Sequence, residues 1–576
     1  MSFVVKNIIN FRENGEILWH AVSEDKGLRV WFAGFLRNRA ELLRELDISA
    51  DNSDAIILLE LFHRRGDRAF PKLNGAFVFA IWQEKDKALL LGRDQLGQKF
   101  LFYAWDAEGR LIFSDSLRDV ISQPGISKEY DLQTLADYFG VGYCPAPSTI
   151  WQAVRKVPPS TVLKFNAGGE CGNNTYWKPQ YLPKLEISFP EAVEESKRLL
   201  EQAIKRCLRG HGQVNFLLSG GIDSGVVLGL AAPMMQQPGQ AISIAFAEAL
   251  YDESALAAQT AKRHGIEQII RKVEPAEIRH MADLLAAAGE PFADSSLLPT
   301  ALALQEAGKS ARGVFTGDGG DEFFCGYRRL QFIAWRSCLG GIPGGIGQGL
   351  AKILLPFLPT SSEQRSTMAN VARLARALAM PMATSFISFQ ELFSPELRRE
   401  LMRKNDVLDY RERWREIALE TQCHDPVEKF AALDIATNLP EDCFRKYDIG
   451  NLESGLDILR PILDLEVVHF ALRLPRTYKL NLRERKRPLR AIGREMLPDI
   501  LLQQGKRGFG TPVASWFRND LKPDLQQLAA SVTEWDRHGW LNASYIQHLV
   551  REHLDSKADH AARLWSLFCL KTWLES

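Results

Sequence analysis

Two glycine-rich segments carry the residue types in this chain that are best suited to chemistry. The first, Ser219–Ser224, reads SGGIDS and follows the apolar run Val214–Leu218. Glycines allow a tight turn and leave backbone N–H groups unobstructed, and where such a turn leads into a helix these groups attract phosphate. Asp223 would place a carboxylate, a preferred ligand of Mg²⁺, beside that phosphate. We predict a phosphate-binding corner here; taken alone, the segment also fits a strand–turn–helix corner with a solvated aspartate.

The second segment, Thr316–Tyr327, reads TGDGGDEFFCGY and holds the carboxylates of Asp318, Asp321 and Glu322. Carboxylates this close together repel one another unless a cation binds between them. A magnesium ion carried on the phosphates of ATP would relieve that repulsion. The segment therefore favours a metal–nucleotide site, and a solvated acidic turn is the alternative when the segment is taken alone.

The elements around these loops alternate between strands and helices. After the first loop we predict strands at Ile242–Phe246, Ile269–Val273 and Gly313–Thr316, and helices at Val226–Ala231, Glu253–His264 and Ala276–Gly289. Such alternation is typical of a doubly wound parallel sheet with helices on both faces. Ligands of these sheets bind outside the carboxyl ends of the strands, where both loops fall.

The N-terminal part has a different pattern, with short strands and few helices. We predict one helix at Ala55–Arg64 and strands at Leu28–Phe32, Ala76–Trp82, Ala88–Leu91 and Leu111–Phe113. This pattern predicts an α+β sandwich. Prolines concentrated between residues 140 and 182 mark a boundary. We therefore predict a first domain at 1–165, a linker at 166–188 and an α/β domain with extra helices at 189–576.

Composition narrows the class of protein. The 576 residues include 71 Lys+Arg and 71 Asp+Glu, so the net charge gives no reason to expect nucleic-acid binding. The eight cysteines include no C-x-x-C pair, which argues against a zinc site or a disulfide framework. No signal peptide and no uninterrupted apolar span is evident. We predict a cytoplasmic enzyme without a transmembrane segment.

The SGGIDS loop resembles the pyrophosphate loop of N-type ATP pyrophosphatases. Together with Thr316–Tyr327, it resembles the synthetase domain of the asparagine synthetase B-like family, in order and spacing over residues 190–525. The resemblance implies a sheet of the adenine-nucleotide α-hydrolase type, with ATP and Mg²⁺ as cofactors. It also implies an AMP-forming amide synthesis, in which a carboxylate attacks the α-phosphorus of ATP and a nitrogen then attacks the acyl-adenylate.

The resemblance also implies roles for individual residues. Those implied to hold the pyrophosphate are Ser219, Gly220, Gly221, Asp223 and Ser224. Those implied to line the adenosine site are Leu217, Ile244, Thr316 and Gly317. Asp223 and Asp321 would carry Mg²⁺. The implied catalytic residues are Asp318, as the base for the attacking amine, Lys506, as the neutraliser of charge on the adenylate and pyrophosphate, and Glu322.

The N-terminal part resembles the glutaminase domain of the same family, an N-terminal-nucleophile (Ntn) hydrolase, at Leu73–Trp82 and Arg93–Lys99. The family needs a cysteine directly after the initiator Met, and here that position is Ser2. Its Asn-Gly-Glu glutamine-binding turn reads Ala33–Gly34–Phe35, so both polar side chains are lost. Because a site built to hydrogen-bond its substrate depends on such groups, we predict a degenerate domain that serves as a scaffold.

The acceptor side departs from the family as well. In Gly455–Asp464, Asp457 replaces a Glu, Leu459 replaces an Arg and Ile462 replaces a Phe, while Arg460 offers a cation one position further on. Such changes argue against free aspartate as the substrate.

Relatives that have lost the glutaminase activity close rings. They include β-lactam synthetases, carbapenam synthetases and the macrolactam cyclases of lasso-peptide (RiPP) biosynthesis. We predict macrolactam closure on a peptide that carries its own amine, together with a precursor-recognition protein and a leader protease as partners. The alternatives are a β-lactam or carbapenam-type synthetase acting on a small-molecule carboxylate, an ammonia-dependent asparagine synthetase, and an inactive scaffold.

Overall fold

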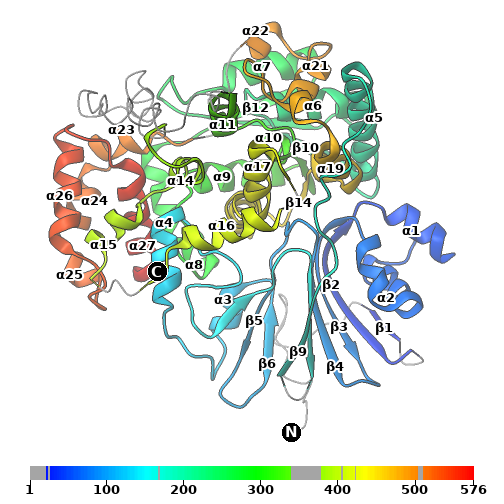
Figure 1. The fold of residues 1–576 in the computed structure, drawn as a ribbon, viewed down its shortest axis with the longest axis horizontal. Helices are drawn as coiled ribbons and strands as arrows, with labels where there is room; N and C mark the ends of the chain where they lie inside the picture. Colours follow the sequence, from blue (N-terminus) through cyan, green and yellow to red (C-terminus); the bar gives the residue numbers. More distant parts are fainter. Residues whose placement is uncertain are drawn as a thin grey trace.

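The protein was examined as a computed structural model. It describes residues 21–23, 26–166, 169–338, 378–403, 407–421, 423–503 and 510–576. Within these residues the chain forms a β-rich N-terminal part and a larger α/β part, which lie against each other (Figure 1). The two-part organisation agrees with the predicted fold class.

The N-terminal part contains two antiparallel sheets (Figure 1). The six-stranded sheet has the order β1 (Ala21–Ser23), β2 (Leu28–Leu36), β3 (Gly75–Gln83), β4 (Ala88–Arg93), β8 (Thr161–Asn166) and β9 (Gly169–Thr175). The three-stranded sheet has the order β6 (Leu111–Ser114), β5 (Phe102–Trp105) and β7 (Val154–Lys156). The accompanying helices are α1 (Arg39–Leu46), α2 (Asp54–Arg65), the 3₁₀ turn η2 (Gly66–Lys72), α3 (Leu117–Ile121) and α4 (Leu132–Val141).

The predicted N-terminal strands and helix are all present with slightly different ends. β3 is buried over almost its whole length, because one face packs on α2 and the other on the second sheet. β9 falls inside the stretch that we predicted as a linker and pairs with β8 as an edge strand.

The second part is built on a five-stranded parallel sheet. Its order is β12 (Glu267–Lys272), β11 (Gln240–Ala245), β10 (Val214–Leu217), β13 (Gly313–Phe315) and β14 (Asp457–Leu459). Phe216 and Phe315 stand in register and face one side of the sheet, whereas Ile242 and Val314 face the other. The helices on the first face are α5 (Phe189–Leu208), α6 (Ile222–Ala231) and α7 (Ser254–Arg263), and those on the second are α8 (His280–Ala288) and α9 (Leu297–Gly308).

Two details of this sheet differ from the sequence prediction. The helix expected at Ala276–Gly289 is divided into a 3₁₀ turn, η4 (Pro275–Arg279), and α8. The reciprocal hydrogen bonds of Glu274 and Glu277 start the turn five residues before α8 and stabilise the division. β14 was not predicted as a strand, and it joins β13 from more than 140 residues further along the chain.

The remaining helices pack around this sheet and beside it (Figure 1). They are α10 (Gly320–Phe323), α11 (Arg328–Cys338), α14 (Met382–Ser388), α15 (Pro395–Leu401), α16 (Tyr410–Glu420), α17 (Pro426–Ala436), α18 (Arg445–Gly450), α19 (Leu465–Arg473), α20 (Arg476–Lys479), α21 (Arg487–Gly493), α22 (Asp499–Gln503), α23 (Val513–Arg518), α24 (Lys522–Ala530), α25 (Val532–Trp535), α26 (Ala543–Leu554) and α27 (Ala561–Glu575). The short turns are η3 (Ala232–Met234), η7 (Leu439–Phe444) and η8 (Pro461–Leu463). None of the helices in the described ranges is long and apolar enough to cross a membrane.

The hydrophobic core is continuous between the two parts. One cluster joins Phe100 and Phe102 of the N-terminal part to Phe216 and Leu459 of the parallel sheet. Buried charges cross the same boundary, since the guanidinium of Arg93 contacts Glu441 at 3.3 Å. The N-terminal part is therefore packed firmly on the part that holds the predicted site.

Candidate functional site

The two glycine-rich segments meet at the carboxyl edge of the parallel sheet. β10 ends at Leu217, the chain turns, and α6 begins at Ile222. The hydroxyls of Ser219 and Ser224 lie 3.1 Å apart across this turn. A Cβ at Gly317 would stand 2.5 Å from the backbone nitrogen of Ser224, so only glycine permits this approach of the second segment to the first.

A cavity of about 590 Å³ opens over this junction, a size that suits a nucleotide-sized ligand. We call it the nucleotide cavity. All predicted site residues within the described ranges line it, namely Leu217, Ser219, Gly220, Gly221, Asp223, Ser224, Ile244, Thr316, Gly317, Asp318, Asp321 and Glu322. Lys506, the remaining predicted catalytic residue, lies outside the described residues, as does Ser2.

Lys486 links the two carboxylates that we predicted to hold Mg²⁺. Its ammonium contacts Asp223, and it lies 2.8 Å from Asp321. A Cβ at Gly326 would collide with the Lys486 side chain at 1.9 Å, so this glycine makes room for the ion pair. The two carboxylates converge on one wall of the cavity and are oxygen donors of the kind that Mg²⁺ takes, although Lys486 stands between them here.

The backbone of Lys486 is unusual. It has φ of 53° and so lies in the left-handed region, at the start of α21. This conformation costs a non-glycine residue about 1–2 kcal/mol. The side chain is nevertheless buried among the site carboxylates, which indicates that the contacts with Asp223 and Asp321 outweigh the strain.

Asp318 is held by groups from three elements. Its carboxylate accepts hydrogen bonds from the Thr316 hydroxyl at 2.8 Å, from Arg460 Nε at 3.0 Å and from the Tyr447 hydroxyl at 3.4 Å. The Arg460 guanidinium lies 4.8 Å from the ring centre of Tyr447, so it also stacks on that ring. Burial and the Asp318 carboxylate both raise the pKa of Tyr447, so its phenol stays a donor at neutral pH.

This geometry explains the changed acceptor-side sequence. Leu459, where the family has an Arg, points into the core from β14. Arg460 follows directly after the strand, and it brings a guanidinium to the edge of the site. The cation that the sequence offers at Arg460 therefore contacts Asp318.

Lys446 on α18 forms a second ion pair at the rim of the cavity. Its ammonium lies 3.1 Å from Asp294 and donates to the Ser296 hydroxyl at 3.0 Å. Burial alone would raise the pKa of Asp294, but Lys446 and the hydrogen bonds from Ser296 hold it below its usual range.

Sequence reasoning did not assign the pairs formed by Lys486 and Lys446. Both lysines belong to helical segments that are far from both loops in the sequence. No local sequence pattern predicts which carboxylate each lysine contacts.

The degenerate glutamine-binding turn lies within a regular strand. Ala33–Gly34–Phe35 belongs to β2 and pairs with β3. The Phe35 ring meets the edge of His211 at 5.9 Å between ring centres, which places it against the α/β part. Asp54, at the start of α2, accepts the Leu36 N–H and the Arg39 guanidinium. These groups therefore serve the structure of the strand and of the domain boundary.

Comparisons with known proteins agree with the site. A family model described as asparagine synthase matches residues 195–575, and one described as a glutamine amidotransferase domain matches residues 12–177. The chain is similar to asparagine synthetase (glutamine-hydrolyzing) 1 of Bacillus subtilis, with 26% identity over 573 residues, 98% of this chain and 88% of the relative.

Other relatives have a similar name or align with a smaller share of this chain. A putative asparagine synthetase (glutamine-hydrolyzing) of Mycobacterium bovis is 26% identical over 94% of this chain and 83% of its own. Amidase chyE of Penicillium rubens is 28% identical over 48% of this chain and 43% of its own. The predicted two-domain fold is thereby confirmed at the level of an amidotransferase-like N-terminal domain and a nucleotide-binding second domain. The chain belongs to the asparagine synthase family and is an ATP-dependent carbon–nitrogen ligase.

Proposed function

We propose that the protein activates a carboxylate as its acyl-adenylate and joins it to an amine of the same substrate, closing a ring. The observation that carries this proposal is the nucleotide cavity, where the SGGIDS corner, the Asp321–Lys486 pair and the Asp318–Arg460 pair face one space. The first feature suits the phosphates of ATP, the second suits the metal and leaving pyrophosphate, and the third suits proton removal from nitrogen.

The chain's own residues would divide the reaction between them. The backbone N–H groups at the start of α6 orient the pyrophosphate while the substrate carboxylate attacks the α-phosphorus. Lys486 offsets the charge on the leaving pyrophosphate, and a magnesium ion held by Asp223 and Asp321 would add Lewis-acid stabilisation. Asp318, held in place by Arg460, accepts a proton from the nitrogen that attacks the acyl carbon as AMP leaves.

The source of the nitrogen separates ring closure from asparagine synthesis. The polar groups of the glutamine turn are absent, and Phe35 packs at the domain boundary. Buried ion pairs fill the contact between the domains, including Lys156 with Glu290 at 2.9 Å. Both observations favour an amine that arrives with the substrate.

Among such substrates we propose a peptide, closed by an isopeptide bond as in lasso-peptide cyclases, with a precursor-recognition protein and a leader protease as partners. A β-lactam or carbapenam-type reaction and ammonia-dependent asparagine synthesis are the alternatives. We also retain the division into 1–165, 166–188 and 189–576 as a proposal, with β9 packed on the first domain.

The test uses ATP–pyrophosphate exchange with the full chain and Mg²⁺, followed by product mass. Three acceptors are compared: a precursor core peptide, a β-amino acid, and aspartate with ammonium. Exchange with the peptide and loss of one water from its mass are expected. Asparagine formation from ammonium would refute ring closure, and absence of exchange with every carboxylate would refute adenylation.

A further inference from the structure

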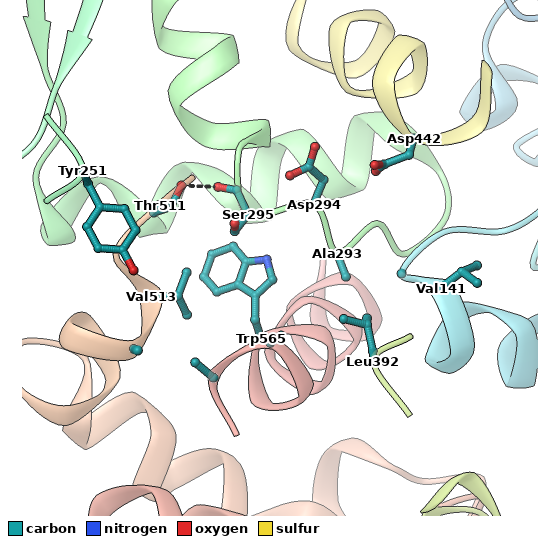
Figure 2. A pocket seen from close by; sticks show the side chains of 14 residues that line it. Val141, Tyr251, Ala293, Asp294, Ser295, Leu392, Asp442, Thr511, Val513 and Trp565 are labelled. Atoms are coloured by element: carbon teal, nitrogen blue, oxygen red, sulfur yellow. Dashed lines mark hydrogen bonds between the residues drawn. The ribbon is translucent and has the colours of Figure 1, made fainter. Parts of the chain in front are cut away.

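A second, smaller cavity of about 240 Å³ lies beside the nucleotide cavity (Figure 2). We call it the side cavity. The loop 293–295, residues 511–514 and the first turns of α27 form most of its wall. Tyr251 lines both cavities, so the two spaces share a wall. The volume suits a group the size of one amino-acid side chain rather than a nucleotide.

The side cavity has one acidic side and one apolar side. Figure 2 shows the carboxylates of Asp294 and Asp442 on one side and the indole of Trp565 on the other. Val513 and Leu392 add aliphatic surface beside the indole. A ligand that carries a cation on a short apolar group matches this division.

The two carboxylates differ in what they contact. Asp294 pairs with Lys446 at 3.1 Å and accepts the Ser296 N–H at 2.8 Å. Within the described ranges, no hydrogen bond or ion pair engages the carboxylate of Asp442. Among the described residues, Asp442 is therefore the carboxyl of this cavity that a ligand could still engage.

The surroundings of Asp442 disfavour its charge when the cavity is empty. Burial and the neighbouring Asp294 raise the pKa of Asp442 to about 8, although Lys446 from α18 and Arg329 from α11 act in the opposite direction. Tyr251 is the other titratable group of the described lining. A cation that enters the cavity would reverse this balance and draw the proton off the carboxyl.

One short helical segment connects the side cavity to the reaction site. Asp442 faces the side cavity, while Cys443, Lys446 and Tyr447 line the nucleotide cavity. Tyr447 also donates to Asp318, the residue assigned to accept the amine proton. Asp294 of the side cavity also pairs with Lys446 of the nucleotide cavity at 3.1 Å, so the two spaces adjoin and a nitrogen bound at Asp442 lies beside the nucleotide cavity.

From these observations we infer that the side cavity binds the attacking amine of the substrate, as a primary ammonium on a small apolar group, with Asp442 as its counterion. This inference rests on the proposed ring-closing function and names the class of its nitrogen donor. The substrate carboxylate is left to the nucleotide cavity.

The proton balance of the amine step then follows. One ammonium proton passes to the Asp442 carboxylate, and the nitrogen lone pair attacks the acyl carbon. The bond between that carbon and the AMP oxygen breaks, AMP leaves with the electron pair, and the second nitrogen proton passes to Asp318. Asp442 and Asp318 both return their protons to water before the next turnover.

The inference is tested by calorimetric titration of the full chain with propylammonium chloride, sodium propionate and propionamide at pH 7. We expect saturable binding of propylammonium alone, with release of close to one proton, read from two buffers of different ionisation enthalpy. Asp442→Asn should weaken binding at least tenfold and abolish proton release. Ala293→Leu, which fills the cavity without changing charge, should also weaken binding at least tenfold.

The matched control is Asp524→Asn, which removes an exposed carboxylate from α24 and should leave binding unchanged. Equal binding of the three probes, or propylammonium binding that neither cavity variant alters, would overturn the inference. The titration needs no turnover, so it is independent of adenylation. If ATP–pyrophosphate exchange is absent but propylammonium still binds, only the proposed function is refuted. If exchange is present but propylammonium does not bind, only this inference is refuted.

Discussion

Replacing Lys156 with methionine tests whether the N-terminal domain is held to the ligase domain by buried charge. Lys156 comes from β7 and is 1% exposed. Its ammonium lies 2.9 Å from Glu290 and 3.3 Å from Glu441, and it donates to the Cys144 carbonyl at 2.5 Å. Burial alone would lower the pKa of Lys156, but the two glutamates outweigh it and raise the pKa, so the lysine is charged.

The expected loss of unfolding free energy follows from these distances. At an effective dielectric constant near 20, two charges separated by about 3 Å attract by roughly 5–6 kcal/mol, before the cost of removing each from water. After Lys156→Met, Glu441 retains Arg93 at 3.3 Å and Glu290 retains Arg445 at 3.6 Å. Arg445 is also paired with Asp448 at 2.6 Å, so the network then holds three carboxylates against two guanidiniums, and for this one uncompensated negative charge we expect a loss of about 3–5 kcal/mol.

The assay is urea unfolding followed by tryptophan fluorescence, with Lys197→Met as the matched control. Lys197 pairs with Glu495 at 2.6 Å on an exposed surface, so its loss should cost less than about 1 kcal/mol. Adding Glu441→Gln to Lys156→Met restores neutrality, so the double variant should lose less than the sum of the single variants. Equal costs for the two lysine variants, or strict additivity with Glu441→Gln, would refute the reasoning.

Three further predictions concern the two cavities. Asp318→Asn should keep ATP–pyrophosphate exchange while amide formation falls by about 10²–10⁴-fold, and an equal loss of both rates would remove its role as base. Lys486→Met leaves Asp223 and Asp321 facing each other and should cost about 3–5 kcal/mol in unfolding free energy, with MgCl₂ restoring part of it; no difference between samples with and without MgCl₂ would contradict the metal assignment. Because the pKa of Asp442 is raised from 3.8 to about 8, its contribution to stability is complete below pH 4 and is lost as the pH rises toward 8. We expect the free energy of unfolding, measured with urea, to be about 2–4 kcal/mol lower at pH 8 than at pH 5, and Asp442→Asn should remove this difference. The full pKa shift would correspond to roughly 6 kcal/mol if the carboxyl were completely excluded from water.

The nucleotide cavity was largely predictable from sequence because its parts follow local rules. A buried strand, a glycine-rich turn and a helix start can each be recognised within a few residues, as at Ser219–Ser224. Parallel strands bring their carboxyl ends to one edge, so the neighbouring loop Thr316–Tyr327 had to lie beside the first. Every predicted residue in the described ranges lines the same cavity for this reason.

The remaining features depend on contacts over long sequence distances. β14 is three residues long and becomes a strand only because β13 offers a free edge. The pairing of Lys486 with Asp223 spans more than 260 residues, and no periodicity of either segment encodes it. The side cavity is assembled from α4, the loop before α9, η7 and α27, so its volume and its acidic side appear only after tertiary packing.

The buried charges at the domain boundary give a physical reason why the chain has this N-terminal domain, although the positions that resemble glutamine-binding groups have changed. Arg93 and Lys156 of that domain both contact Glu441, which lies in the turn η7. Asp442, the next residue, faces the side cavity, and α18 follows with the lysine and tyrosine that line the nucleotide cavity. Neutralising both cations would leave Glu441 buried without either partner, which is costly. The N-terminal domain thus fixes the turn η7, whose residues border both cavities.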